Sequence, residues 1–89
     1  MLERKVTIIN RLGLHARAAA KFVKLANRFN ASVKIEKDGI LIDGKSILGI
    51  LTLAAVQGTI ITMTISGADE KSALKALISL IENRFEEGE

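Results

Sequence analysis

The stretch Thr59-Ile60-Ile61-Thr62-Met63-Thr64-Ile65-Ser66 decides the fold, because from its third residue large apolar side chains alternate with small polar ones. A period of two predicts a β-strand with one buried face and one solvated face. A sheet built from such strands needs a second layer over its apolar face. The apolar set is Ile61, Met63 and Ile65, and the polar set is Thr62, Thr64 and Ser66.

Three further segments have the character of strands. Residues 3–9 contain the β-branched run Val6-Thr7-Ile8, and residues 32–36 alternate strictly between polar and apolar side chains. Asp38-Gly39 then predicts a tight turn into residues 40–42, so that the second and third strands form a hairpin. The sequence therefore predicts four strands in an antiparallel sheet.

Three amphipathic helices are expected between and after these strands. The first spans residues 16–29 and stops at Asn30 in a left-handed conformation. The second spans residues 46–54, with its first serine as N-cap. The third runs from about residue 69, capped by its aspartate, to about residue 85. The core-facing residues are Ala19, Phe22, Ala26 and Phe29 in the first helix, Ile50, Leu53 and Ala54 in the second, and Leu74, Leu77, Ile78, Ile81 and Phe85 in the third.

The element order β-α-β-β-α-β-α predicts an α+β fold of two layers, with the helices on one side of the sheet. A chain of 89 residues fits one domain, which we place at residues 1–89. The chain contains no cysteine, which excludes disulfides and thiolate metal sites. No apolar run approaches the roughly 20 residues of a membrane span, and no signal peptide is evident. We expect a soluble, cytoplasmic protein that does not bind membranes.

Charge is distributed unevenly along the chain. From Arg4 to Lys34 there are eight basic residues and no acidic residue. A basic half predicts an anionic partner, which includes phosphate, an acidic protein surface and nucleic acid. The plain alternative is a solvated helix face that keeps the protein soluble. The eight residues are Arg4, Lys5, Arg11, Arg17, Lys21, Lys24, Arg28 and Lys34.

His15 is the single histidine, and in a chain without cysteine it is the strongest nucleophile available at neutral pH. It lies where a loop containing Gly13 meets the start of the first helix. The first turn of a helix offers unpaired N–H groups and a positive dipole end, which together bind anions. Arg17 adds forked donors suited to phosphate oxygens. This combination indicates phosphoryl transfer through His15, although a lone histidine is more often structural.

The second helix has more apolar surface than one short helix can bury against one sheet. Ile50 belongs to its core-facing arc, while Ile47, Leu48 and Leu51 share a neighbouring arc. An exposed aliphatic patch on a small protein marks a partner surface. The alternative is a helix sunk deep into the core. Ser46 is sufficiently explained as an N-cap, yet an exposed serine there is also a good acceptor for regulatory phosphate.

Two motifs resemble those of the HPr family, the histidine-containing phosphocarriers of the bacterial sugar phosphotransferase system. Gly13-Leu14-His15-Ala16-Arg17 is similar to the family's active-site signature, and Gly44-Lys45-Ser46-Ile47-Leu48-Gly49 is similar to its second signature. The resemblance covers essentially the whole chain. It implies an open-faced β-sandwich with sheet order 1-4-2-3, covered by three helices.

The resemblance also implies a mechanism and partners. Phosphorylated enzyme I would give its phosphoryl group to Nδ1 of His15, which would pass it to a IIA domain with help from Arg17. Ser46 would be the target of HPr kinase/phosphorylase. Residues expected to contact partners are Ile47, Leu48, Leu51, Ala18, Lys21 and Lys24.

One residue departs from the family pattern, because Ala18 stands where the family usually has proline. Alanine is an excellent helix former, so the helix is expected to survive with a less rigid start. The rival function is a small basic nucleic-acid-binding domain. Such domains often stack bases on aromatic rings, and this chain has no Tyr or Trp and only three Phe. We therefore expect no nucleic-acid partner, and no metal or other cofactor.

Overall fold

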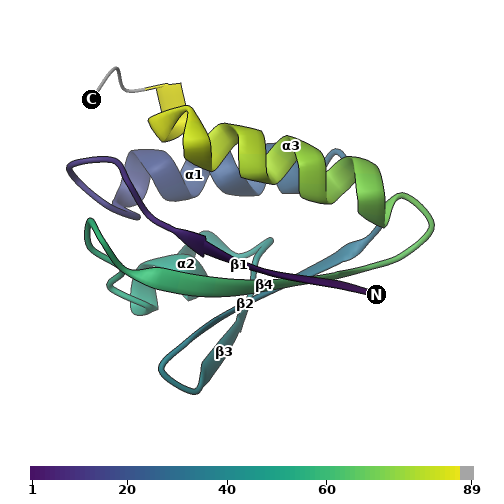
Figure 1. Cartoon of the computed structure of the whole chain (residues 1–89), viewed down its shortest axis with the longest axis horizontal. Coiled ribbons are helices and arrows are strands. Elements are labelled where there is room, and N and C mark those ends of the chain that lie inside the picture. The colour runs from purple at the N-terminus through teal and green to yellow at the C-terminus, as the bar shows by residue number, and fades with distance from the viewer. Residues whose placement is uncertain (87–89) are drawn as a thin grey trace.

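The computed structural model describes residues 1–86, so the last three positions of the expected domain lie outside it. A four-stranded antiparallel sheet has the order β1-β4-β2-β3, and α1 and α3 lie side by side over one of its faces (Figure 1). The expected α+β class and the 1-4-2-3 order are confirmed. Within residues 1–86 no helix is both long and apolar enough to cross a bilayer. The elements are β1 (Leu2–Thr7), α1 (Ala16–Ala26), β2 (Ser32–Lys37), β3 (Ile40–Asp43), α2 (Ile47–Thr52), β4 (Ile60–Ser66), α3 (Glu70–Glu82) and the short 3-10 turn η1 (Arg84–Glu86).

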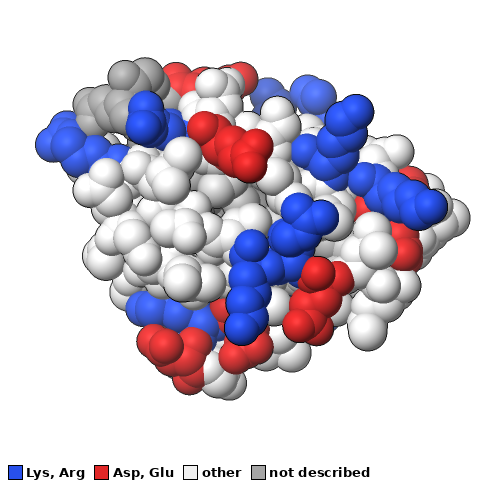
Figure 2. Space-filling model, viewed as in Figure 1, with Lys and Arg blue, Asp and Glu red and all other residues white. Residues whose placement is uncertain are grey.

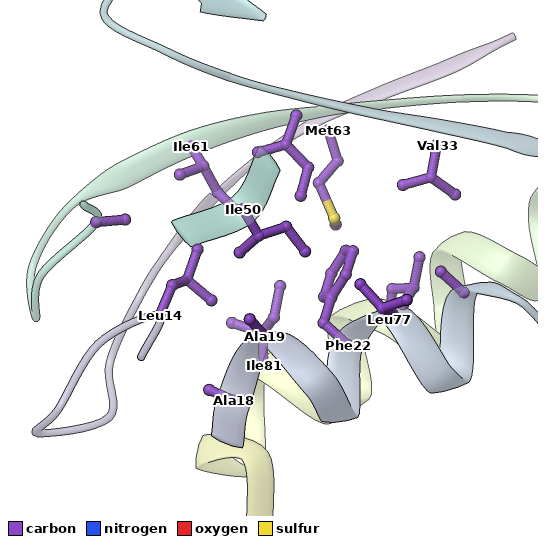
Figure 3. Packing of buried hydrophobic residues seen from close by; sticks show 14 of the residues in the cluster. Leu14, Ala18, Ala19, Phe22, Val33, Ile50, Ile61, Met63, Leu77 and Ile81 are labelled. Atoms are coloured by element: carbon purple, nitrogen blue, oxygen red, sulfur yellow. The ribbon is translucent and has the colours of Figure 1, made fainter. Parts of the chain in front are cut away.

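The central strand β4 carries the apolar face that its sequence predicts. The three residues of that face, Ile61, Met63 and Ile65, are at most 1% exposed. Met63 pairs with Ile35 of β2, and Ile61 pairs with Val6 of β1, so the apolar face continues across the neighbouring strands. Phe22 of α1 and Leu77 of α3 meet this face from the helix layer (Figure 3). The core therefore lies between the sheet and the helices, as a two-layer fold requires.

The hairpin between β2 and β3 also forms as expected. Asp38 and Gly39 both have positive φ values, 52° and 83°, which suit a two-residue turn whose twist matches that of the flanking strands. Lys37 and Ile40 then pair directly across the turn.

The first helix is shorter than its sequence pattern predicts. It ends at Ala26, and its C-cap Asn27 has a right-handed conformation. Asn30 is not in the left-handed region, so the expected stop at that residue is wrong. The chain after the helix is held instead by Asp69, whose Oδ2 accepts from the Asn30 N–H at 2.8 Å. A side chain from the start of α3, distant in sequence but adjacent in the fold, thus fixes this segment, and no local sequence pattern predicts the contact.

Asp69 has a different role from the one expected. It stands at the N-cap position of α3, but its side chain makes no capping hydrogen bond. Its two oxygens accept from the N–H groups of Asn30 and Ala31, each at 2.8 Å. These bonds, that of Asn30 first, hold the pKa of Asp69 below its usual value. The carboxylate therefore ties the start of β2 to the start of α3.

Two helix ends also differ from expectation. Ala54 was placed on the core face, but it lies exposed beyond the end of α2 with a φ of 50°. Helix α3 ends at Glu82 rather than near residue 85. Phe85 is nonetheless fully buried, because a turn with positive φ values follows the helix and returns this ring to the core.

The double hydrogen bond of Asp69 predicts a pH-dependent contribution to stability. Because its folded pKa is lowered, the carboxylate stabilises the fold above the unfolded value of 3.8 and loses this effect as pH falls through the folded pKa. Asp69→Asn loses the charge and leaves one amide hydrogen facing a backbone N–H. We expect a lower Tm at about pH 7, and a difference from wild type that shrinks towards about pH 3.

Thermal unfolding over this pH range checks the prediction, with Asp38→Asn as the matched control. Asp38 is exposed in the hairpin turn, where asparagine adopts its positive φ equally well. An Asp69→Asn deficit that stays constant across the pH range would contradict the assigned role of the charge.

Candidate functional site

The loop before α1 is built on a buried asparagine. Asn10 is fully buried, and its Nδ2 donates to the carbonyl oxygen of Gly13 at 2.8 Å. In return the Gly13 N–H donates to the Asn10 carbonyl oxygen at 3.1 Å. These reciprocal bonds close the loop and fix the direction in which the chain enters the helix.

The same loop docks against the segment that follows α2. The Leu14 N–H donates to the carbonyl oxygen of Ala55 at 2.8 Å. Gly13 has a φ of +68°, and a Cβ on it would lie 2.4 Å from that oxygen and 2.9 Å from Cα of Val56. Only glycine provides both this conformation and this approach. The position of His15, which directly follows Leu14, is therefore set by backbone contacts.

His15 is the N-cap residue of α1. Its backbone is extended, with φ −78° and ψ 179°, and its carbonyl oxygen accepts from the Ala19 N–H at 2.8 Å. Its imidazole is partly exposed and makes no capping hydrogen bond. The side chain therefore leaves the helix at the end where first-turn N–H groups and the positive dipole end favour an anion. No acidic residue lies in that first turn.

The basic residues of α1 differ in their surroundings. Arg17 and Lys24 are exposed. Lys21 is partly buried, and its Nζ donates to the carbonyl oxygen of Phe85 at 2.7 Å and lies 3.8 Å from Oε1 of Glu86. Lys21 is thus engaged within the chain, whereas Arg17 and Lys24 present their charge to solvent.

Ala18 does not belong to the exposed surface. Its side chain is fully buried and lies in the core near the start of α1 (Figure 3). The expectation that it contacts partners is therefore wrong. Ala18 and Ala19 both face inward and are fully buried, and their small side chains let α1 approach its neighbours closely. Arg17 lies on the exposed side of the helix.

Helix α2 packs against α1 and divides its aliphatic residues as the sequence indicated. Ile50 is fully buried, Leu51 is half-buried, and Ile47 and Leu48 are 40% and 76% exposed. The alternative of a helix sunk into the core is therefore excluded. The Oγ of Ser46 accepts from the Gly49 N–H at 3.0 Å, which confirms its N-cap role.

Sequence reasoning overlooked two exposed aliphatic residues beside the loop. Leu12 is 51% exposed and Val56 is 66% exposed. Val56 lies against Gly13, so both residues flank the entry to α1. Each is an aliphatic residue in a loop that contains glycine, outside any strand or helix pattern that would place it in the core. That feature of the sequence could have predicted their exposure.

The charged groups around the site contain no metal-binding cluster. Within the described part of the chain, no three His, Cys, Asp or Glu side chains lie close enough to hold an ion together. The fold and site thus define a small α+β protein that presents one histidine at a helix start, beside an exposed arginine and an aliphatic patch.

Comparisons with known proteins identify the family. The model of the PTS HPr component phosphorylation site matches residues 2–83. Phosphocarrier protein HPr of Cupriavidus necator is 52% identical over 89 residues, covering all of both chains. HPr of Pseudomonas aeruginosa is 50% identical over 86 residues, with 96% of each chain covered. The crystal structure of HPr from Thermoanaerobacter tengcongensis has a TM-score of 0.94 and 44% identity, with 98% of each chain covered. The chain belongs to the HPr family of phosphocarrier proteins of the phosphotransferase system.

The docking of the loop predicts a large difference between two glycine substitutions. Gly13→Ala must strain a left-handed residue and displace Ala55, whereas Gly39→Ala strains a similar conformation with no atom within 4 Å of the new Cβ. We expect Gly39→Ala to lower the free energy of unfolding by about 1 kcal/mol. Gly13→Ala adds an overpacking cost of about 1–3 kcal/mol. Urea unfolding of both variants checks this prediction. Equal losses in the free energy of unfolding would show that the loop can move away from the new methyl group without an energetic penalty.

Proposed function

We propose that His15 receives a phosphoryl group from phosphorylated enzyme I and passes it to a IIA domain. The observation that carries the proposal is that His15 occupies the N-cap of α1 without using its side chain as a cap. An uncharged ring nitrogen attacks phosphorus, the new N–P bond forms, and the bond from phosphorus to the donor breaks. Transfer to the IIA domain is a second exchange of the same kind with phosphorylated His15 as the donor. The acceptor group of the IIA domain forms a bond to phosphorus, and the N–P bond at His15 breaks.

The chain supplies the electrostatic part of this transfer. The transferred oxygens carry negative charge throughout, and donors fixed in advance stabilise that charge without reorganising. First-turn N–H groups of α1 and the forked guanidinium of Arg17 are the donors nearest in sequence. The absence of acidic residues from the first turn removes a source of repulsion.

Partner binding is assigned to the aliphatic surface near this site. Ile47, Leu48 and Leu51 of α2 supply the patch, and the overlooked Leu12 and Val56 extend it to the loop. Such apolar surface on a small protein marks an interaction site. Lys24 would steer an acidic partner from the rim. Enzyme I and a IIA domain would bind this surface in turn.

The central test is removal of the imidazole. His15→Ala should abolish acid-labile phosphorylation by enzyme I and phosphoenolpyruvate, because no second histidine exists to replace it. Intact-mass measurement detects the added phosphoryl group, and circular dichroism confirms that the variant is folded. Arg28→Ala, at an exposed residue just beyond α1, should still be labelled. A His15→Ala protein labelled at the wild-type rate would refute the carrier function.

Regulation is assigned to Ser46, with HPr kinase/phosphorylase as the modifying enzyme. Phosphoserine carries about −1.5 to −2 charges at pH 7, and at an N-cap it can accept from first-turn N–H groups. Helix α2 is therefore expected to stay folded. The phosphate would, however, adjoin the exposed Ile47 and Leu48, where an apolar interface tolerates an unpaired charge poorly.

Two substitutions separate capping from regulation. Ser46→Asp keeps an acceptor for the Gly49 N–H and adds charge, so it should slow transfer with little loss of stability. Ser46→Ala should transfer normally but lose about 1 kcal/mol of stability. Ser72→Asp adds the same charge to the first turn of α3 and should leave transfer unchanged. Normal transfer in Ser46→Asp together with slow transfer in Ser46→Ala would overturn the switch.

A further inference from the structure

A groove of about 600 Å³ lies between β1 and α3. Its floor is aliphatic, formed by the buried Leu74 and the half-buried Leu2 and Ile78. Three exposed basic residues line it, Arg4 from β1 and Lys71 and Lys75 from α3. Figure 2 shows the face that carries these two elements, and basic side chains lie over and between them.

The groove is separate from the site around His15. It starts beside the first residues of β1, at the end of the molecule where the N-terminus lies (Figure 1), and follows most of α3, from Lys71 to Glu82. None of its lining residues comes from α1, α2 or the loop before α1. Helix α2 and the loop before α1 lie at the opposite end. A partner in the groove would therefore leave the candidate phosphoryl-transfer site accessible.

The groove borders an open sheet edge. Strand β1 stands at the end of the order β1-β4-β2-β3, and within residues 1–86 no strand pairs with its outer side. The Ile8 N–H donates to the Thr59 carbonyl at 2.8 Å, just beyond the end of β1. Backbone groups alternate in direction along an antiparallel strand. Glu3, Lys5 and Thr7 consequently turn their N–H and C=O groups outward.

The cations around the groove repel one another. Lys71 and Lys75 are four residues apart on one helix, a spacing at which like charges destabilise a helix. Arg4 lines the same groove from the strand, and Glu82 is the one acidic residue in its lining. A bound anionic group would offset this repulsion, so the charge favours an acidic occupant.

A second copy of the chain does not fit this edge. Arg4 and Lys5 stand at the centre of β1, so antiparallel pairing of two such strands brings their basic residues together. Charged residues on an edge strand are a recognised barrier to self-pairing. The same charges attract a strand of opposite sign. The edge thus discriminates between a copy of itself and an acidic segment.

We propose that β1 and the groove bind an extended acidic segment of a partner protein as a fifth strand. Backbone hydrogen bonds to the outer edge of β1 would hold the segment, and its groove-facing side chains would alternate between acidic and aliphatic residues. The aliphatic ones cover Leu2 and Ile78, and the acidic ones meet Arg4, Lys71 and Lys75. This surface is independent of the proposed phosphoryl transfer.

The probe is a short acetylated and amidated peptide of sequence E-T-V-T-E-T-I-T-E, titrated calorimetrically into the full chain. We expect binding that falls by about tenfold or more in Lys75→Glu, because a contact of opposite charge becomes a repulsive one. Lys34→Glu changes the net charge equally on β2, in register with Thr64 and away from the groove, and should bind normally. The peptide with lysine in place of glutamate should not bind.

Strand addition is tested separately from charge. Lys5→Pro removes an outward N–H at an edge position that tolerates proline, whereas Lys5→Gln removes only the charge. Proline should abolish peptide binding while glutamine retains most of it, with circular dichroism verifying that both variants are folded. Equal binding by these two variants would refute the added strand.

Three other results would also overturn the proposal. One is unchanged binding in Lys75→Glu, and another is equal binding of the lysine peptide. The third is dimerisation of the chain alone in sedimentation velocity that Lys5→Pro abolishes, which would assign the edge to a second copy.

Discussion

The hydrogen bond from the Leu14 N–H to the Ala55 carbonyl oxygen is the contact on which the site depends. It joins the segment before α1 to the segment after α2, and the close approach of Gly13 to Ala55 leaves the loop little room to shift. Because His15 follows directly, its place at the helix start is set by backbone geometry. A nucleophile held in this way needs no side-chain contact to orient the peptide that carries it.

Much of the fold could be predicted because solvent contact alternates along the chain. Strand β4 is buried on one face, and that leaves a period of two in its sequence. The turn at Asp38-Gly39 and the N-cap at Ser46 could also be predicted, because both depend on the conformational preferences of single residues. The position of His15 at a helix start followed from the same local reasoning. Local rules were therefore sufficient for the elements and for the central residue.

What could not be predicted are choices between distant partners. Nothing near Asp69 indicates that its carboxylate accepts from Asn30 and Ala31 rather than from its own helix. Ala18 was expected to contact partners because of the family resemblance, but the rotation of α1 against the core places it inside. Lys21 was read as a surface charge because its acceptor, the carbonyl of Phe85, is 64 residues away. Periodicity gives each residue a face, and the packing of whole elements determines what that face meets.

The turn after α3 shows how such a distant contact limits the basic face. Arg84, Phe85 and Glu86 all have positive φ values, a conformation that costs of order 1 kcal/mol for each residue without a glycine. Burial of the Phe85 ring and the bond from Lys21 to its carbonyl offset this cost. A partner that draws Lys21 away must therefore also compensate for a destabilised turn. Arg17 and Lys24 make no such contact with the turn. An anionic partner therefore gains more binding free energy from these two residues than from Lys21 between them.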